Sequence, residues 1–234
     1  MRFKIAVLQP YFFPYIGYWQ LINAVDVFVI FDDVNFINRG WINRNNILIK
    51  NKPHLITLPL SGASQNDLIN EISLHNDIKH KEKILNTIKL AYAKAPFFTQ
   101  GFGLVEKIIL NEELNLAKYL KFQIEEVARY LNIETEIILS SDLHNDKNLK
   151  AQDKIIDICK LQKCMQYINP IGGVDLYNKE KFKENEIVLN FIETKNIKYE
   201  QFDHDFIANL SIIDIIMFNS PEKIKEMLQE YELV

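Results

Sequence analysis

The chain has 234 residues, a formal net charge of −4, a hydrophobic fraction of 48% and a charged fraction of 25%. This is the composition of an ordinary globular protein that can bury a substantial core, and the charge gives no electrostatic reason to expect a nucleic-acid or anionic-membrane partner. Because no apolar run approaches membrane-spanning length and the N-terminus lacks the pattern of a signal peptide, we expect a cytoplasmic protein with reduced thiols and without membrane insertion.

The first elements in chain order are predicted to form a βαβ unit. Residues 3–9 (FKIAVLQ) and 26–33 (DVFVIFDD) are short apolar runs of the kind found in buried strands of a largely parallel sheet. Between them, residues 15–25 carry apolar side chains at helical spacing, such as Ile16 and Trp19, which predicts a short helix. A strand, a helix and a second strand in this order indicate a βαβ unit.

The rest of the chain continues the alternation. Residues 45–60 predict two strands joined by a turn at Asn51-Lys52-Pro53. Ser220 as N-cap and Pro221 in the first turn predict a last helix. The other predicted elements are helices at 79–94, 101–110, 115–132, 151–164 and 210–219, a strand at 135–142, a short strand and loop at 166–177, and a strand at 186–193.

This order of elements predicts an α/β fold with a Rossmann-like, mostly parallel sheet. We expect residues 1–234 to fold as one domain, with a helical insertion or lobe at about residues 79–131.

The loop from Gln9 to Gly17 follows the first predicted strand, where doubly wound sheets bind their ligands. Pro10 and Pro14 would stiffen it by fixing φ, and Gly17 would permit close approach of a ligand or a neighbouring strand. The helix N-terminus behind it favours an anion such as phosphate. Flat faces with hydroxyl tips, suited to a base or sugar ring, are offered by Tyr11, Tyr15 and Tyr18. The alternative interpretation, a proline-kinked loop closed by aromatic packing, has equal weight on the residues alone.

Asp32 and Asp33 end the second predicted strand, at the same edge of the sheet. Adjacent strand residues point to opposite faces, so we expect the two carboxylates to have different roles. One could bind a ligand hydroxyl or accept a proton, while the other pairs with an arginine or caps a turn. A solvated turn is the alternative.

Residues 38–45 (NRGWINRN) place Trp41 between Arg39 and Arg44, two of the chain's four arginines, with Asn43 alongside. Guanidinium groups bind phosphate or carboxylate in a bidentate way, and a tryptophan can stack on a ring. This concentration favours an anion site over a solvated face.

Two later loops are weaker candidates. In the stretch from Asn169 to Gly173, the consecutive Gly172 and Gly173 would let backbone amides face a phosphate or carboxylate, although a simple tight turn explains them equally well. The serines of Ser140-Ser141-Asp142 could donate hydroxyls to a ligand or cap the next segment.

Cysteine and histidine spacing indicates neither a disulfide nor a metal site. Cys159 and Cys164 are five residues apart on a predicted helix and would not share a face. No HxH or HxxxH spacing occurs, so we predict no metal. The histidines are His54, His75, His80, His144 and His204.

Several stretches together resemble the WbqC-like family: residues 9–33 (QPYFFPYIGYWQLINAVDVFVIFDD), 38–45 (NRGWINRN), 92–98 (YAKAPFF), 167–177 (YINPIGGVDLY) and 210–219 (LSIIDIIMFN). Members of this family are associated with bacterial O-antigen and other surface-polysaccharide gene clusters. They are thought to help make amino sugars with unusual N-acyl or aminoacyl groups. The resemblance implies a nucleotide-linked amino-deoxy sugar as substrate. It makes these residues the best site candidates: Gln9, Pro10, Tyr11, Pro14, Tyr15, Asp32, Asp33, Arg39, Trp41, Asn43, Arg44, Asn169, Gly172 and Gly173.

The layout of the first βαβ unit is also similar to that of HxGH nucleotidylyltransferase-like proteins, some of which form amides through acyl-adenylates. In that group, loop histidines and a helix N-terminus hold ATP phosphates. Tyr15 and Tyr18 stand where those histidines would be, and a tyrosine, with a pKa of about 10, is not cationic. The likeness therefore concerns the fold rather than ATP activation.

The leading hypothesis is a transferase or ligase that acylates the amino group of a nucleotide-linked amino sugar. Asp32 or Asp33 would take the ammonium proton, and Gln9, Asn43 or the glycine amides would stabilise the oxyanion. Arg39 and Arg44 would hold the diphosphate, with Tyr11 or Trp41 stacking on a ring.

The acyl donor stays open. An acyl-CoA or other thioester needs no ATP, whereas a free amino acid needs ATP and Mg²⁺ for activation. The competing hypothesis is a non-catalytic sugar-nucleotide-binding or scaffolding subunit of a polysaccharide assembly complex. The sequence also leaves open whether the chain forms a homo-oligomer.

Overall fold

The computed structural model describes residues 3–202 and 205–234. At its centre is a six-stranded sheet in the order β10-β9-β8-β1-β2-β7, parallel except for β10. The predicted α/β fold with a mostly parallel sheet is thus confirmed. The strands are β1 (Lys4–Leu8), β2 (Val27–Ile30), β7 (Glu136–Leu139), β8 (Gln166–Pro170), β9 (Val188–Thr194) and β10 (Tyr231–Leu233).

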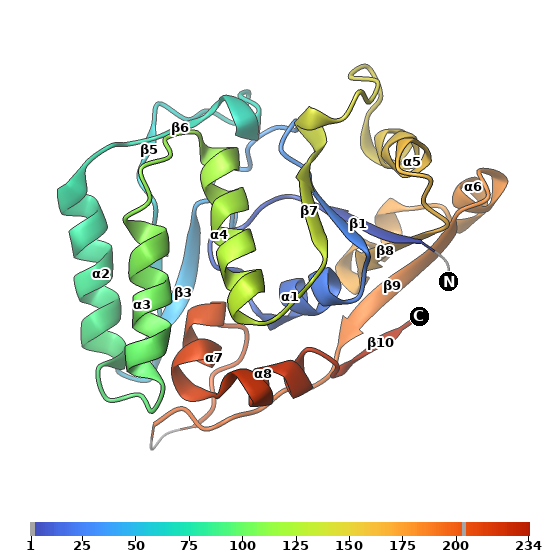
Figure 1. The fold of residues 1–234 in the computed structure, drawn as a ribbon. Helices are drawn as coiled ribbons and strands as arrows, with labels where there is room; N and C mark the ends of the chain where they lie inside the picture. The colour runs from blue at the N-terminus through green and yellow to red at the C-terminus, as the bar shows by residue number, and fades with distance from the viewer. Residues whose placement is uncertain (1–2, 203–204) are drawn as a thin grey trace.

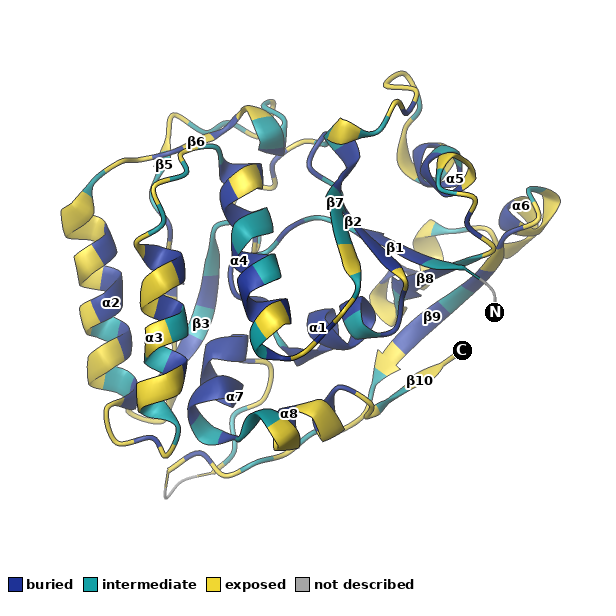
Figure 2. Cartoon of the chain, in the orientation of Figure 1, coloured by how far each residue is buried: buried dark blue, intermediate teal, exposed yellow. Residues whose placement is uncertain are grey.

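The two central strands are apolar on both faces because helices cover both faces of the sheet. Ile5 and Val7 of β1 belong to one hydrophobic core, while Ala6 and Leu8 contact the other. Figure 2 shows these strands buried between the layers, with exposed residues on the outer faces of the helices. Burial on both sides is why these strands appear in the sequence as continuous apolar runs.

Helices flank the sheet in two layers (Figure 1). The core that contains Ile5 and Val7 is closed by α5 (Ala151–Leu161) and α6 (Lys179–Glu184). The larger core takes in the remaining helices: α1 (Ile16–Asn23), α2 (Ile78–Tyr92), α3 (Phe98–Ile109), α4 (Leu116–Tyr130), α7 (Ile212–Phe218) and α8 (Pro221–Met227).

The order of the strands puts the reversal point of the sheet between β1 and β8. Along the chain, β2 and then β7 are added on one side of β1, and β8 and β9 are added afterwards on its other side. Pairing of β1 with β8 covers only Lys4 with Gln166 and Ile5 with Tyr167, whereas β1 follows β2 as far as Leu8. The two strands therefore separate toward their carboxyl ends, and such a reversal point is where doubly wound sheets bind ligands.

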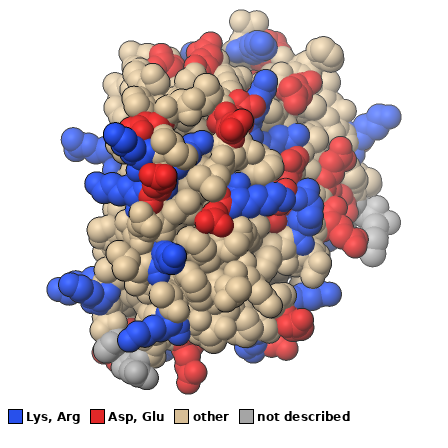
Figure 3. All heavy atoms as spheres, turned by 60° about the vertical axis from the view of Figure 1, so that its left-hand side comes forward, with Lys and Arg blue, Asp and Glu red and all other residues tan. Residues whose placement is uncertain are grey.

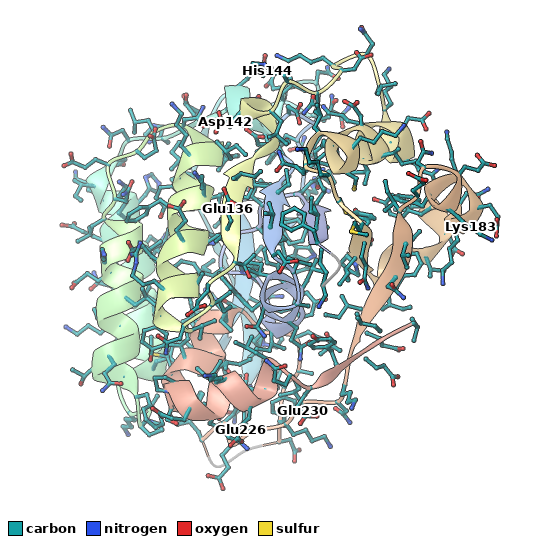
Figure 4. All side chains as sticks on the ribbon, turned by 45° about the vertical axis from the view of Figure 1, so that its right-hand side comes forward. Glu136, Asp142, His144, Lys183, Glu226 and Glu230 are labelled. Atoms are coloured by element: carbon teal, nitrogen blue, oxygen red, sulfur yellow. The ribbon has the colours of Figure 1, made fainter. Side chains whose placement is uncertain are left out.

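Loops gather at the edge where the parallel strands end, here called the carboxyl edge. Figure 4 shows its position: Glu136 lies at the start of β7, and Asp142 and His144 lie beyond its end. The long segment between β2 and β7 begins at this edge. It contains the hairpin β3 (Arg44–Ile49) and β4 (Lys52–Thr57), the short pair β5 (Leu60–Ser61) and β6 (Ser73–Leu74), and helices α2, α3 and α4.

The predicted helical segment at 79–131 corresponds to α2, α3 and α4, which stand side by side in Figure 1. Asp77 caps α2 by accepting from the Lys79 N–H at 2.9 Å, and Asn115 caps α4 by accepting from the Lys118 N–H at 3.1 Å. These caps fix the helix starts close to the predicted positions.

The hairpin turn differs from the prediction at Asn51-Lys52-Pro53. The turn residues are Lys50 and Asn51, with φ of 48° and 59°, and Pro53 lies within β4, paired with Leu48. A two-residue turn with positive φ at both positions matches the twist of a hairpin. Proline is held at negative φ and cannot occupy it.

The C-terminal region confirms the predicted final helices and adds two elements. Ser220 caps α8 and Pro221 occupies its first turn, as expected. Helix α6 and strand β10 were not anticipated from the sequence. Cys159 and Cys164 are buried free thiols. The expectation that they lie apart on one helix is wrong, because α5 ends at Leu161 and the two thiols hydrogen-bond to each other.

Within the described residues, every helix is too short or too polar to cross a membrane. On the face shown in Figure 3, basic and acidic side chains are interspersed.

Candidate functional site

The loop after β1 is held in place by side chains from distant parts of the chain. Phe13 has a φ of 44°, an unfavourable value for a bulky residue. Its N–H donates to Gln123 Oε1 at 2.9 Å, and its carbonyl accepts from Asn45 Nδ2 at 2.7 Å and from Ser211 Oγ at 2.9 Å. These contacts fix a loop that has neither helical nor strand hydrogen bonding of its own.

Fixing this loop creates an open cavity of about 290 Å³, here called the aromatic cavity. The Phe12 N–H donates to the carbonyl of Trp41 at 3.1 Å. This hydrogen bond ties residues 38–45 to the loop after β1. The Trp41 side chain is 47% exposed, which leaves its ring available. The cavity is lined by Tyr11, Pro14, Tyr15, Trp41, Asn45 and Asn209.

The tyrosines of this cavity are neutral hydrogen-bond donors. Burial raises the pKa of both the Tyr11 and Tyr15 hydroxyls above the ordinary value. The Tyr18 hydroxyl donates to the Gln9 carbonyl at 3.1 Å, so Tyr18 supports the loop from below rather than facing the cavity. The Gln9 side chain is half-buried.

A smaller cavity of about 240 Å³ adjoins the first, sharing Tyr15 and Asn209 as lining residues. It includes Thr194 at the end of β9 and Tyr199. Gly17 is required here, because a Cβ atom at its position would lie 2.6 Å from Thr194 Oγ1. The close approach expected of this glycine is therefore to a neighbouring strand and to the Tyr15 ring.

Asp32 and Asp33 lie beyond the end of β2, and their carboxylates do not point to opposite faces as expected, because both reach the Ser140 hydroxyl. Their other partners differ. Asp32 is fully buried, and its carboxylate accepts from the Ser141 N–H at 2.9 Å and from the Ser141 hydroxyl at 2.6 Å. Asp33 forms a buried ion pair with Lys154 at 2.7 Å, with each side chain only 6% exposed. The Ser140 hydroxyl lies within hydrogen-bonding distance of one oxygen of each carboxylate. The partner of Asp33 is thus a lysine rather than an arginine.

Asp33 lines a cavity of about 700 Å³, here called the lysine cavity, at the carboxyl edge beyond β2. Lys147 and Lys150 are exposed on the loop that leads into α5, and Lys154 lies in the first turn of that helix. The cavity is lined by Phe31, Asp33, Val34, Asn35, Leu68, Asn70, Glu71, Lys147, Leu149, Lys150, Ala151 and Lys154. Among the described residues, the lining sets of this cavity and the aromatic cavity do not overlap. The aspartates and the tyrosines therefore do not line one common cavity.

Most of the arginine-containing stretch is engaged with its own loop. Arg44 donates through Nε to the Gly40 carbonyl at 2.9 Å and also to the Arg39 carbonyl. Asn43 Nδ2 donates to the Leu58 carbonyl at 2.9 Å. Arg39 is exposed. Trp41 and Asn45 are the members of this stretch that line the aromatic cavity.

Asn169 lies near the end of β8, and Gly172 and Gly173 follow it, across the reversal point from β1. Asn169 is buried, and its Nδ2 donates to the Tyr167 hydroxyl at 2.8 Å. The two glycines fall in a 3₁₀ segment, Ile171–Leu176. Gly173 packs against the Asn169 amide.

Lys154 and Asn209 are among the lining residues of these cavities that were not singled out from the sequence. Lys154 lies four residues before Ile158 and therefore on the buried face of α5. A lysine is rarely buried without a partner of opposite charge, so this spacing is the signal that could have identified it. Asn209 lies in an irregular loop at a φ of 59°, and nothing in the sequence marks it.

The fold and its cavities define a doubly wound α/β protein with open cavities along the carboxyl edge of its sheet. Residues 9–226 match the WbqC-like protein family, and the chain belongs to that family.

A protein of Mycobacterium tuberculosis (strain ATCC 25618 / H37Rv), described as uncharacterized protein Rv1507c, is 24% identical over 217 residues, which cover 91% of this chain and 92% of that protein. No solved structure matches the chain significantly.

Proposed function

We propose that this protein is a cytoplasmic enzyme of bacterial surface-polysaccharide biosynthesis that forms an amide on the amino group of a nucleotide-linked amino-deoxy sugar. The aromatic cavity is the observation that carries the proposal. It lies on the loop after β1, beside the reversal point of the sheet, and presents two tyrosines and a half-exposed tryptophan. Aromatic faces of this kind bind a nucleobase or sugar ring, and the hydroxyls orient it.

The amide-forming step needs a neutral amine. Its nitrogen attacks the carbonyl carbon of the acyl donor, the C–N bond forms, the leaving group departs, and a base takes the ammonium proton. Asp33 suits this role better than Asp32, because it lines the lysine cavity, into which the amine of the bound sugar would have to extend, whereas the Asp32 carboxylate is enclosed by serine donors. Gln9 is a better oxyanion donor than Asn43, whose amide is bound to Leu58.

The lysine cavity suits an anionic acyl donor. Lys147, Lys150 and the N-terminus of α5 would neutralise the phosphates of either acyl-CoA or ATP with Mg²⁺. Arg39, exposed two residues before Trp41, would bind the diphosphate of the sugar nucleotide.

Ligand binding tests the aromatic cavity. Trp41→Ala should weaken the binding of uridine and thymidine diphosphates about tenfold or more, since loss of one stacking aromatic costs about 1–3 kcal/mol. Trp41→Phe keeps a flat ring and should retain most of the affinity. Calorimetric titration measures both, and equal affinity of Trp41→Ala and wild type would remove the cavity from the proposal.

Turnover tests the chemistry. The protein is incubated with a panel of nucleotide-linked amino sugars, with acyl-CoA or with ATP and amino acids, and mass spectrometry reports which sugar gains mass. Asp33→Asn should abolish the gain while sparing sugar-nucleotide affinity. Full activity in both Asp32→Asn and Asp33→Asn would eliminate the assigned base.

The second candidate function is a non-catalytic sugar-nucleotide-binding or scaffolding subunit. The pairing of Asp33 with Lys154 favours it, because this carboxylate already has a buried cation as its partner. It predicts binding of nucleotide-linked sugars without product for every donor tested.

A further inference from the structure

A separate group of side chains lies where β6 leads into α2. His75 directly follows β6, Asp77 is the N-cap residue of α2, and His80 lies in the first turn of the helix. Each offers one potential ligand atom, and these three atoms lie within 4.8 Å of one another. Both histidines are exposed, so an ion from solution can reach them.

The backbone holds this group in position. The His75 N–H donates to the Pro59 carbonyl at 2.9 Å, and the His75 carbonyl accepts from the Asp77 N–H at 3.0 Å. The two oxygens of Asp77 divide their roles: Oδ1 caps the helix, while Oδ2 lies 2.9 Å from His80 Nδ1. The carboxylate therefore faces the histidine without giving up its cap.

Two imidazoles and one carboxylate form a donor set that suits Zn²⁺ and similar ions. Zinc binds histidine nitrogen and carboxylate oxygen at about 2.0–2.2 Å, so neighbouring atoms of a tetrahedral site are roughly 3.4 Å apart. Small side-chain rotations bring atoms that already lie within 4.8 Å to that spacing. Calcium and magnesium instead prefer oxygen-rich sites, which a single carboxylate does not provide.

We propose that His75, Asp77 and His80 bind a divalent transition-metal ion, Zn²⁺ in the first place, with water completing its coordination. The sequence predicted no metal, because its histidines show neither HxH nor HxxxH spacing. In this site His75 and His80 are five residues apart, and Asp77 between them supplies the third ligand. The bound ion ties the end of β6 to the first turn of α2. This site is independent of the proposed function.

The test uses the full chain after chelator treatment. Calorimetric titration with ZnCl₂ should show saturable binding of one ion, and Co²⁺ should give the visible absorption of a low-coordinate site. His75→Ala and His80→Ala should each weaken Zn²⁺ binding about tenfold or more and reduce the Co²⁺ absorption. Zn²⁺ should raise the melting temperature of wild type and leave that of these variants unchanged.

Two further variants separate metal ligation from other effects. Asp77→Asn keeps a good N-cap acceptor, so it should melt close to wild type without metal but bind Zn²⁺ more weakly. His144→Ala removes an exposed histidine beyond β7 (Figure 4) and should bind Zn²⁺ like wild type. The proposal fails if wild type shows no saturable binding, if His75→Ala and His80→Ala keep wild-type affinity, or if His144→Ala loses as much as they do.

Discussion

Gly172 and Gly173 are adjacent in the chain but meet different surroundings. A Cβ atom on Gly173 would lie 2.2 Å from Asn169 Oδ1, whereas among the described residues no atom lies within 4 Å of a Cβ built on Gly172. Asn169 is buried and hydrogen-bonded to Tyr167, which limits how far it can retreat. Gly173 therefore has a packing role that is independent of any ligand.

Gly173→Ala should lower the free energy of unfolding by about 1–3 kcal/mol, because the added methyl group overpacks a filled site. Gly172→Ala is the matched control and should change stability by no more than about 0.5 kcal/mol. Urea denaturation measures both. Equal stability of the two variants would contradict the assigned packing role.

At the scale of elements, the β3–β4 hairpin shows how a turn sets its own sequence requirement. Lys50 and Asn51 both have positive φ, which asparagine tolerates better than lysine. Both side chains are exposed, so substitutions there leave the packing of the hairpin intact. The turn is therefore a local site at which stability can be raised.

The double substitution Lys50→Asn and Asn51→Gly should stabilise the protein by about 0.5–1 kcal/mol, because Asn-Gly is the preferred pair for a turn of this type. Thermal and urea unfolding provide the measurement. Lys52→Gly, in the adjoining strand, should destabilise the protein instead. A turn at Asn51-Lys52-Pro53 would predict no gain from the double substitution.

At the scale of the whole molecule, a buried carboxylate links three regions. Asp214 of α7 accepts from the Tyr92 hydroxyl of α2 at 2.7 Å, from the Tyr199 hydroxyl at 2.7 Å and from Gln201 Nε2 at 2.6 Å. The Tyr92 oxygen in turn accepts from the Leu48 N–H of β3 at 2.9 Å. The network joins the hairpin, the helical segment and the wall of the smaller cavity.

This network gives stability a pH dependence of predictable sign. Burial raises the pKa of the Asp214 carboxyl above its ordinary value, although the hydrogen bonds from Tyr199, Tyr92 and Gln201 oppose the rise. The folded state therefore holds this proton more tightly than the unfolded chain does. The stability that Asp214 contributes is fully present below its unfolded pKa of about 4 and is lost as the pH rises through the folded pKa.

Asp214→Asn removes that titration, so its destabilising effect relative to wild type should be smaller at pH 7 than at pH 4. Urea unfolding of both proteins from pH 4 to pH 7 gives the difference in their free energies of unfolding at each pH. Groups that titrate equally in both proteins cancel in this difference. Parallel stability curves for the two proteins would contradict the raised pKa.

The sequence by itself determined the elements whose signals are local. The apolar runs of β1 and β2, the helical spacing of α1 and the Ser220-Pro221 start of α8 depend on neighbours a few residues away. It also determined that Tyr11, Tyr15 and Trp41 were candidates, because their residue types and the prolines that precede the two tyrosines are visible without coordinates.

Only the tertiary structure decided which of these residues meet. Asp33 and Lys154 are 121 residues apart in the chain, and their ion pair and the cavity around it follow from the parallel pairing of β2 with β7 and the placement of α5. Long-range contacts of this kind are set by the packing of whole elements, for which the local pattern of side chains carries no signal.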